Sequence, residues 1–281
     1  TWEPLFWQLV ALGTTGAIIS AGVSRGIERV TKILMPVLLV LLVICDIRAL
    51  TLPGAGRGIE FLFKPDFSKL TGMAVLTALG LSFFKLSLGM GTMTTYGSYQ
   101  PDSVNLIGNA AQVAFSDTAI SLLAGLAIFP AVFAFGFEPA AGPSLLFIPI
   151  PTVFGKMPFG GFFTTLFFVL AGIATIGAMV SLFEVPVAWL TEKKKKPLTR
   201  RMASVITGAV IFLFGVPATL SLGPLEGIKV FGRNFFDLFV FLSSNVILPL
   251  GGIGIALVLG WRLSKSDYAA EIMKGVRGKA P

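Results

Sequence analysis

The sequence predicts an all-α integral membrane protein, and its composition and its long apolar stretches support this fold class. Of the 281 residues, 54% are hydrophobic and 13% are charged, whereas a soluble domain usually carries about 25% charged residues. The mean hydropathy is +0.86. So few charges cannot cover a water-facing surface of this size, which argues against a soluble enzyme, a DNA-binding protein and a disordered chain.

Seven apolar stretches are candidates for membrane-crossing helices, because about 20 mostly apolar residues cross a bilayer. Several stretches are longer than this, so we expect tilt, breaks or extensions beyond the membrane. The stretches cover residues 5–22, 33–50, 73–99, 105–135, 158–190, 202–222 and 235–261.

Cysteine, histidine and the basic residues restrict the chemistry of the chain. Cys45 is the single cysteine and the sequence contains no histidine, which excludes an intramolecular disulfide, a cysteine metal cluster and a His-based triad. No nucleophile–base pattern is present, so we expect no enzyme activity. The basic residues follow the membrane sides, which disfavours nucleic-acid binding, and we expect no cofactor.

The basic residues also predict the orientation of the spans. Fourteen of the 22 lie in loops on one side, including the run Lys193–Lys196. By the positive-inside rule this side is cytoplasmic, with the C-terminus inside and the N-terminus outside. The lysine run is then a topological anchor, and binding of anionic lipid is the sharper alternative.

Two segments on the predicted external side are longer than turns. They cover residues 51–72, which are rich in Gly and Pro, and residues 136–157, which mix turn residues with an apolar patch. Loops of this length are often lids over a site. Packing on the external face is an equally good interpretation of both.

Three ionisable residues lie inside apolar stretches: Lys85, Asp117 and Glu184. Lys85 is roughly 18 Å of helix from one end of its span, too far for its side chain to reach water. Asp117 is expected at a comparable depth, so the two could form an ion pair, either as structure or within a transport site. Glu184 is nearer the cytoplasmic end of its span and could reach polar groups there.

Two glycines follow Lys85, in the run Ser87-Leu88-Gly89-Met90-Gly91. Each glycine weakens a helix by about 1 kcal/mol relative to alanine. Broken helices at membrane depth expose backbone groups that bind ligands in many transporters. Close helix packing through small residues is the alternative, and the lysine favours the broken helix.

Four segments of the chain resemble bacterial neurotransmitter:sodium symporters, which have the leucine-transporter fold. The stretch FFKLSLGMGTMTTYGSY is similar to their broken sixth helix. RGIERVTKILMP resembles the loop into the fifth helix, SLFEVPVAWL the end of the eighth, and FLSSNVILPLGG the tenth. The similarity covers nearly the whole chain.

This resemblance implies an inverted-repeat helical bundle with the family's fourth to tenth helices, in a bacterial plasma membrane. The first three helices would come from a second segment or chain. The implied division is residues 1–50 for the end of the first repeat, 51–72 for an external loop, 73–261 for the second repeat, including an external lid loop at 136–157, and 262–281 for a cytoplasmic tail.

The resemblance also implies where substrate and ions bind. Lys85 stands where the family has a hydroxyl ligand of the first sodium, and Asp117 where it has asparagine. Gly177 and Ala178 replace hydroxyl ligands of the second sodium. Val240 stands at an external-gate position, for which Asp237 could substitute. The substrate positions are Phe84, Lys85, Ser87, Met90, Met179 and Leu182.

These residues together predict a secondary transporter of neutral, apolar or aromatic amino acids that works without sodium. The ammonium of Lys85 would replace the first sodium, and proton coupling, uniport and exchange all stay open. An ordinary sodium symporter and a membrane sensor that binds amino acids without moving them are the alternatives.

Overall fold

The computed structural model describes residues 2–136, 151, 158–193 and 196–277. In this part of the chain the regular structure is helical, apart from one antiparallel bridge between Val230 and Arg233. This agrees with the predicted all-α class. The helices up to the broken span are α1 Glu3–Ser20, the π-helical η1 Val23–Glu28, α2 Arg29–Leu50, α3 Ala55–Phe63, the short 3₁₀ helix η2 Phe67–Lys69, α4 Gly72–Lys85 and α5 Thr92–Ser98.

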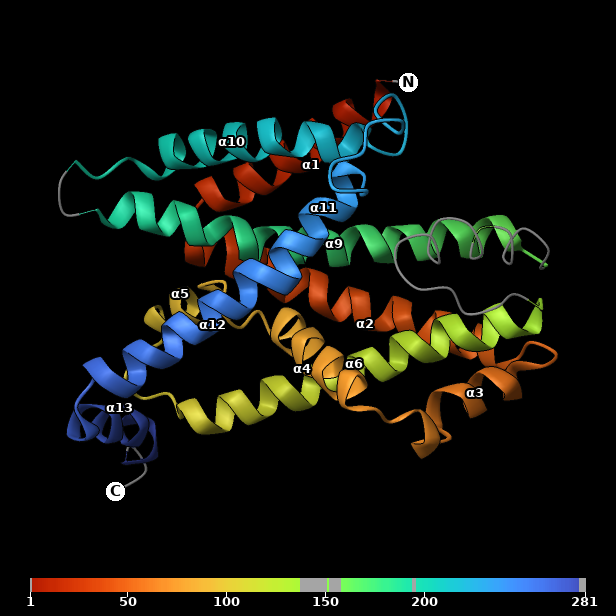
Figure 1. Ribbon diagram of the computed structural model, residues 1–281, viewed down its shortest axis with the longest axis horizontal. Coiled ribbons are helices and arrows are strands. Elements are labelled where there is room, and N and C mark those ends of the chain that lie inside the picture. The colour runs from red at the N-terminus through yellow and green to blue at the C-terminus, as the bar shows by residue number, and fades with distance from the viewer. Residues whose placement is uncertain (1, 137–150, 152–157, 194–195, 278–281) are drawn as a thin grey trace. The chain divides into compact units, whose positions relative to one another are not determined.

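The second part of the chain contains the longest helices (Figure 1). Five helical runs among the described residues are long and apolar enough to cross a membrane. The expected count of about seven spans is not confirmed, because α1, α4 and α5 are not among these five. The remaining helices are α6 Leu106–Ala134, α9 Gly160–Glu192, α10 Arg200–Leu220, α11 Phe235–Phe241, η3 Leu242–Ile247, α12 Leu248–Leu257, η4 Val258–Arg262 and α13 Lys265–Arg277.

The chain forms two compact units. The first unit combines residues 1–29, 71–114 and 178–281, and the second combines residues 30–70 and 115–177. This division follows packing. The division expected from the sequence follows internal repeats, which is a different criterion.

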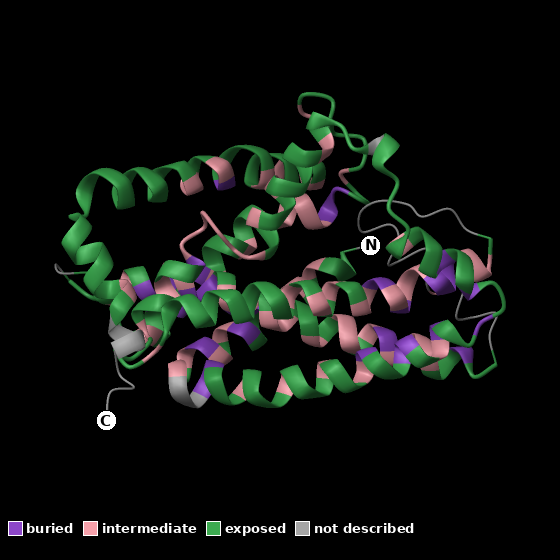
Figure 2. Cartoon of the chain, turned by 90° about the horizontal axis from the view of Figure 1, so that it is seen from below, coloured by how far each residue is buried: buried purple, intermediate pink, exposed green. Residues whose placement is uncertain are grey.

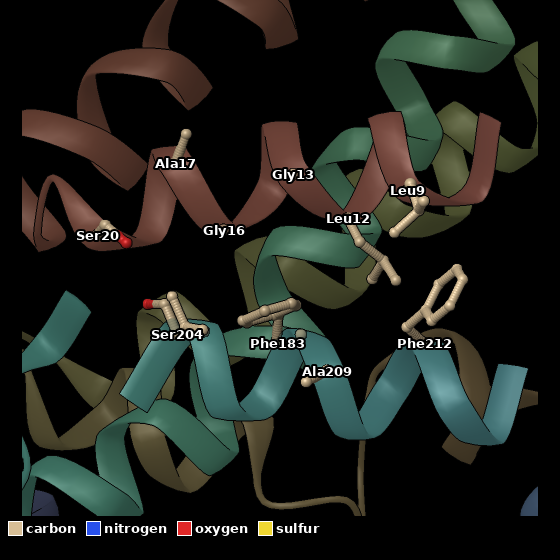
Figure 3. Close-up of a pocket in the computed structure, with 12 residues that line it drawn as sticks. Leu9, Leu12, Gly13, Gly16, Ala17, Ser20, Phe183, Ser204, Ala209 and Phe212 are labelled. Atoms are coloured by element: carbon tan, nitrogen blue, oxygen red, sulfur yellow. The ribbon is translucent and has the colours of Figure 1, made fainter. Parts of the chain in front are cut away.

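In the first unit, α1 and α10 lie side by side and enclose a groove of about 470 Å³ (Figure 3). The ring of Phe183, from α9, lies between them. A Cβ atom on Gly208 would be 3.5 Å from this ring, and one on Gly16 would be 4.0 Å from it. Near the other end of α1, Gln8 donates to the carbonyl of Phe212 at 3.3 Å. Gln8 also accepts a hydrogen bond from the hydroxyl of Thr219 at 2.8 Å, so small residues and polar contacts together hold this pair.

The same unit contains a long rod made of α11, η3, α12 and η4. Asn234 caps its start by accepting a hydrogen bond from the amide of Asp237 at 2.8 Å. The middle and end of the rod are π-helical, with looser turns that often occur at functional sites. The rod packs across α4 (Figure 1).

In the second unit, small side chains let α2, α6 and α9 approach closely. Ala49 of α2 packs with Ala131 of α6 and Phe167 of α9 in one buried cluster. Cys45 packs with Ala127 in a neighbouring one. Interfaces of this kind are typical of helices that associate in a membrane, where van der Waals packing replaces the hydrophobic effect.

The segment 51–72 folds as α3 and η2, and α3 packs on α6. The ring of Phe61 lies 4.9 Å from Phe129 and 5.3 Å from Phe133, between centroids. A Cβ on Gly58 would lie 2.4 Å from the nitrogen of Pro130, so only glycine allows this approach. The α3 helix is therefore closely packed on α6, and the lid interpretation of this segment stays a prediction. The segment expected as a second external loop, 136–157, lies almost wholly outside the described residues.

Most residues along the helices are exposed (Figure 2), and many of these residues have large apolar side chains. Val40 of α2 is 58% exposed, Phe214 of α10 is 69% exposed and Leu250 of α12 is 62% exposed. A soluble monomer rarely exposes contiguous apolar surface of this extent. Lipid is the natural solvent for such faces.

Candidate functional site

The predicted break in the helix after Lys85 is present. The first half, α4, ends at Lys85, and the second half, α5, begins at Thr92. Between them the backbone turns through positive φ angles of 54° at Ser87, 82° at Gly89 and 81° at Gly91. A non-glycine residue at positive φ is strained, and such strain gathers at functional sites.

The break is held by contact with the backbone of the α12 rod. A Cβ on Gly89 would lie 2.5 Å from the carbonyl oxygen of Leu248. A Cβ on Gly251 would lie 1.9 Å from the carbonyl oxygen of Gly89. Both interpretations of the glycines are therefore correct, because the same residues break one helix and admit another.

Two cavities lie beside the break. The larger, about 910 Å³, is lined by Gly89, Gly91 and the polar side chains of α5, by the end of α9 around Trp189 and Glu192, and by α12 and η4. The smaller, about 240 Å³, includes Ser87 and Phe83 in its wall. Both cavities have mostly apolar walls with a few hydroxyl groups and glycine backbone groups. Such a combination is typical of small-molecule sites.

The predicted substrate residues of the first unit gather at the break and on α9. Phe84 and Leu182 are each 50% exposed. Ser87, Met90 and Met179 are half-buried. Ser87 lines the smaller cavity, and the role of the others as a pocket wall stays a prediction.

The predicted ion-site residues are divided between the two units. Lys85 and Ala178 belong to the first unit, and Asp117 and Gly177 to the second. The pairing of Lys85 with Asp117 therefore stays a prediction. Within the second unit, a Cβ on Gly177 would be 3.0 Å from the Cε of Met35, so a larger side chain would require that methionine to move.

The two predicted gate positions lie on α11. Asp237 is exposed in the first turn of this helix, and Val240 follows it and is 45% exposed. An acidic residue in the first turn is stabilised by the helix dipole, which is the local reason for Asp237. A gating role for either residue stays a prediction.

Glu184 reaches polar groups, as the sequence predicted. The residue is fully buried. Its Oε1 accepts a hydrogen bond from the hydroxyl of Tyr99 at 2.6 Å, and its Oε2 accepts one from Nη2 of Arg200 at 2.5 Å. Arg200 also donates through Nε to the carbonyl of Ile19 at 2.7 Å, in the last turn of α1. A buried charge is stable only when it is paired and hydrogen-bonded in this way.

Sequence reasoning missed two residues. In the sequence, Arg200 is one of several basic residues in a predicted loop, whereas in the structure it is the ion-pair partner of Glu184. Asp46 was overlooked because it lies close to the end of its span. It is 5% exposed, and neither carboxylate oxygen has a hydrogen-bond partner among the described residues. The helical spacing of Leu42, Cys45, Asp46 and Ala49 on one face could have revealed it.

Comparison with known proteins decides the family. A model described as the sodium:neurotransmitter symporter family matches residues 3–276. The chain belongs to the sodium:neurotransmitter symporter family. This family consists of membrane transporters rather than enzymes, which agrees with the class that the sequence predicted.

Two bacterial proteins are similar to nearly the whole of this chain. A Bacillus subtilis protein named "Uncharacterized sodium-dependent transporter YhdH" is 43% identical over 99% of this chain and 61% of its own length. A Haemophilus influenzae protein named "Uncharacterized sodium-dependent transporter" is 40% identical over 96% of this chain and 59% of its own length. The chain thus spans about three fifths of the length of these relatives.

One solved structure of high similarity establishes the leucine-transporter fold. It is the crystal structure of MhsT in complex with L-phenylalanine. The TM-score is 0.87 at 45% identity, over 99% of this chain and 64% of that one. The fold class predicted from the sequence is therefore confirmed, and a small-molecule substrate is expected of the family.

Proposed function

We propose that the complete protein is a secondary transporter of neutral, apolar or aromatic amino acids that works by alternating access and does not require sodium. The observation that carries this proposal is the basic residue Lys85 at the last turn of α4, directly before the break. Backbone groups freed at such a break can hold the polar end of a substrate. The ammonium group supplies a fixed positive charge for its carboxylate.

Side chains near the break support an apolar substrate. Phe84, Met90, Met179 and Leu182 are the predicted wall, and methionine adapts to the shape of its neighbours. MhsT, which shares the fold, was solved with L-phenylalanine bound. Phenylalanine is therefore the first substrate to test.

The composition at the second ion position supports sodium independence. A hard cation needs several oxygen ligands, and neither Gly177 nor Ala178 has a side-chain oxygen. In the first ion position, the cation of Lys85 neutralised by Asp117 would take the place of sodium. The proton, uniport and exchange modes all fit this composition.

An ordinary sodium symporter is the second candidate, favoured by the names of the relatives. Both curated bacterial proteins are named sodium-dependent transporters. In that case Lys85 and Asp117 would form a structural pair, and sodium would bind at other oxygen ligands.

Uptake measurements separate the candidates. The complete protein in proteoliposomes should accumulate radiolabelled L-phenylalanine equally well when sodium is replaced by choline or potassium. The double variant Lys85→Thr with Asp117→Asn should gain a partial sodium requirement, because it restores neutral oxygen ligands. A strict sodium requirement of the unchanged protein would reject sodium independence, and binding without uptake would point to a sensor.

A further inference from the structure

Asp46 lies on the buried face of α2, four residues before the end of that helix. It shares this face with Leu42, Cys45 and Ala49. All four are at most 5% exposed. Both carboxylate oxygens are covered by protein and have no hydrogen-bond partner within the described ranges.

The neighbours of this face are apolar and belong to the same compact unit. Cys45 packs against Ala127 of α6, and Ala49 packs against Ala131 of α6 and Phe167 of α9. A cavity of about 250 Å³ lies beside Cys45 and Leu42, lined almost wholly by apolar side chains. Apolar cavities of this kind stay dry, and Asp46 itself is not among the lining residues.

No described charge on the packed elements compensates Asp46. Residues 122–134 of α6 and 160–177 of α9 contain no titratable side chain. The guanidinium of Arg48 donates to the hydroxyl of Thr51 at 3.1 Å and lies over the ring of Phe163.

The charged side chains of α3 are also paired with another residue or exposed. Glu60 is paired with Lys64 at 2.6 Å, and Arg57 is exposed. The remaining titratable group beside the carboxyl is the buried thiol of Cys45.

An ionised carboxylate in such a place is very costly, since it has lost water and gained no partner. A metal ion would need further ligands, and no group of three or more His, Cys, Asp or Glu side chains occurs in the described part of the chain. Binding of a proton neutralises the carboxylate and needs no further ligand.

We infer that Asp46 is a proton-binding site of this transporter and that its proton is exchanged during transport. The second statement rests on the proposed function. The carboxylate takes one proton from water on one side of the membrane and becomes a neutral acid. It then returns that proton to water on the other side, and no electrons move. Exposure of the Asp46 carboxyl to water is the event that allows the proton to leave.

Carbodiimide labelling tests the proton-binding statement on the unchanged protein. Dicyclohexylcarbodiimide enters membranes and reacts with protonated carboxyl groups. At neutral pH, mass spectrometry should find the adduct on Asp46. The exposed carboxylate of Asp267, which accepts a hydrogen bond from Ser264, should stay unlabelled and serves as the matched control. An unmodified Asp46 under conditions that label other membrane carboxyls overturns the site.

Proton flux tests the exchange statement. Proteoliposomes containing a pH-sensitive dye should report a change in internal pH when L-phenylalanine enters. The Asp46→Asn variant imitates the neutral acid in shape, and its proton flux should be lost while phenylalanine uptake or exchange continues. Equal flux in the variant and the unchanged protein would overturn the assignment to Asp46, and absence of flux in the unchanged protein would overturn exchange.

The two proposals fail in different ways. If no amino acid is transported, the proposed function is rejected, and labelling of Asp46 still decides the proton site. If uptake is present and Asp46 is unlabelled, the proposed function survives and the proton site is rejected.

Discussion

Glu184 and Asp46 are both carboxylates buried in long apolar helices, but their surroundings are opposite. Glu184, in the first unit, is held by Arg200 and by the hydroxyl of Tyr99. Asp46, in the second unit, lies on a buried helix face beside Cys45 and Ala49, which pack in apolar clusters, and has no hydrogen-bond partner among the described residues. The same functional group is therefore a charged anchor in one unit and a candidate neutral acid in the other. Its partners, more than its depth, decide which.

The largest effect on stability is expected when the Glu184 carboxylate loses its cation. Arg200→Ala leaves the Glu184 carboxylate buried and unpaired by a cation, and breaking a buried pair in this way costs about 3–5 kcal/mol. Thermal unfolding in detergent should show a much lower Tm. Arg201→Ala, at the adjacent exposed arginine, is the matched control and should change stability by less than about 0.5 kcal/mol. Equal effects of the two variants would show that the ion pair contributes little.

A smaller effect on stability is expected when the Glu184 carboxylate loses only a hydrogen bond. Tyr99→Phe removes one donor to the Glu184 carboxylate and keeps the ion pair with Arg200. A hydrogen bond to a charged group contributes about 1.5–3 kcal/mol. The same unfolding assay should therefore give a Tm between those of Arg200→Ala and the unchanged protein. Tyr268→Phe, at a tyrosine that is 50% exposed, is the control, and a matching loss there would contradict this prediction.

Little or no loss is expected when the carboxyl of the second unit is removed. Asp46→Leu replaces a group without hydrogen bonds by an apolar one with the same number and branching of heavy atoms, so stability should stay within about 1 kcal/mol or rise. Glu184→Leu, measured alongside, should be strongly destabilising, because it leaves Arg200 without its carboxylate. A loss for Asp46→Leu as large as that for Glu184→Leu would mean that Asp46 has a stabilising partner, and the contrast between the units would fail.

The smallest effect is expected at an exposed pair. Lys64 donates a hydrogen bond to Glu60 at 2.6 Å, and this bond lowers the pKa of the Glu60 carboxyl below its ordinary value. Stability from this pair is present above the ordinary pKa of Glu and is lost as pH falls through the lowered value. Both side chains are largely exposed, so Lys64→Ala should leave the Tm unchanged in physiological salt. A clear, salt-sensitive drop in Tm would show that this ion pair contributes more to stability than its exposure predicts.

The sequence was sufficient for the fold class, the family and the break. Apolar stretches and sparse charge predict membrane helices by composition alone. Glycines after Lys85 predict the break because they tolerate positive φ, and the structure adds that Gly251 is needed opposite Gly89. That second requirement could not be predicted, since it depends on two helices far apart in the chain.

The roles of Arg200 and Asp46 could not be predicted for a similar reason. The sequence places Arg200 with other basic residues at a membrane boundary, and only tertiary packing directs it toward Glu184 rather than to solvent. Asp46 lies two residues before Arg48, so its position suggests a helix end that is exposed to water. Small residues pack on this face of the helix, and Asp46 is buried instead.

The close approach of Gly89 and Gly251 has a mechanical consequence. Side chains between helices act as a compliant layer, because rotamers can shift while backbones stay in place. Here main chain meets main chain, and a Cβ added to Gly251 would come within 1.9 Å of the Gly89 carbonyl oxygen. The junction has no such layer to absorb displacement. We therefore expect that a displacement of the rod at Leu248–Leu257 moves the unwound segment with it.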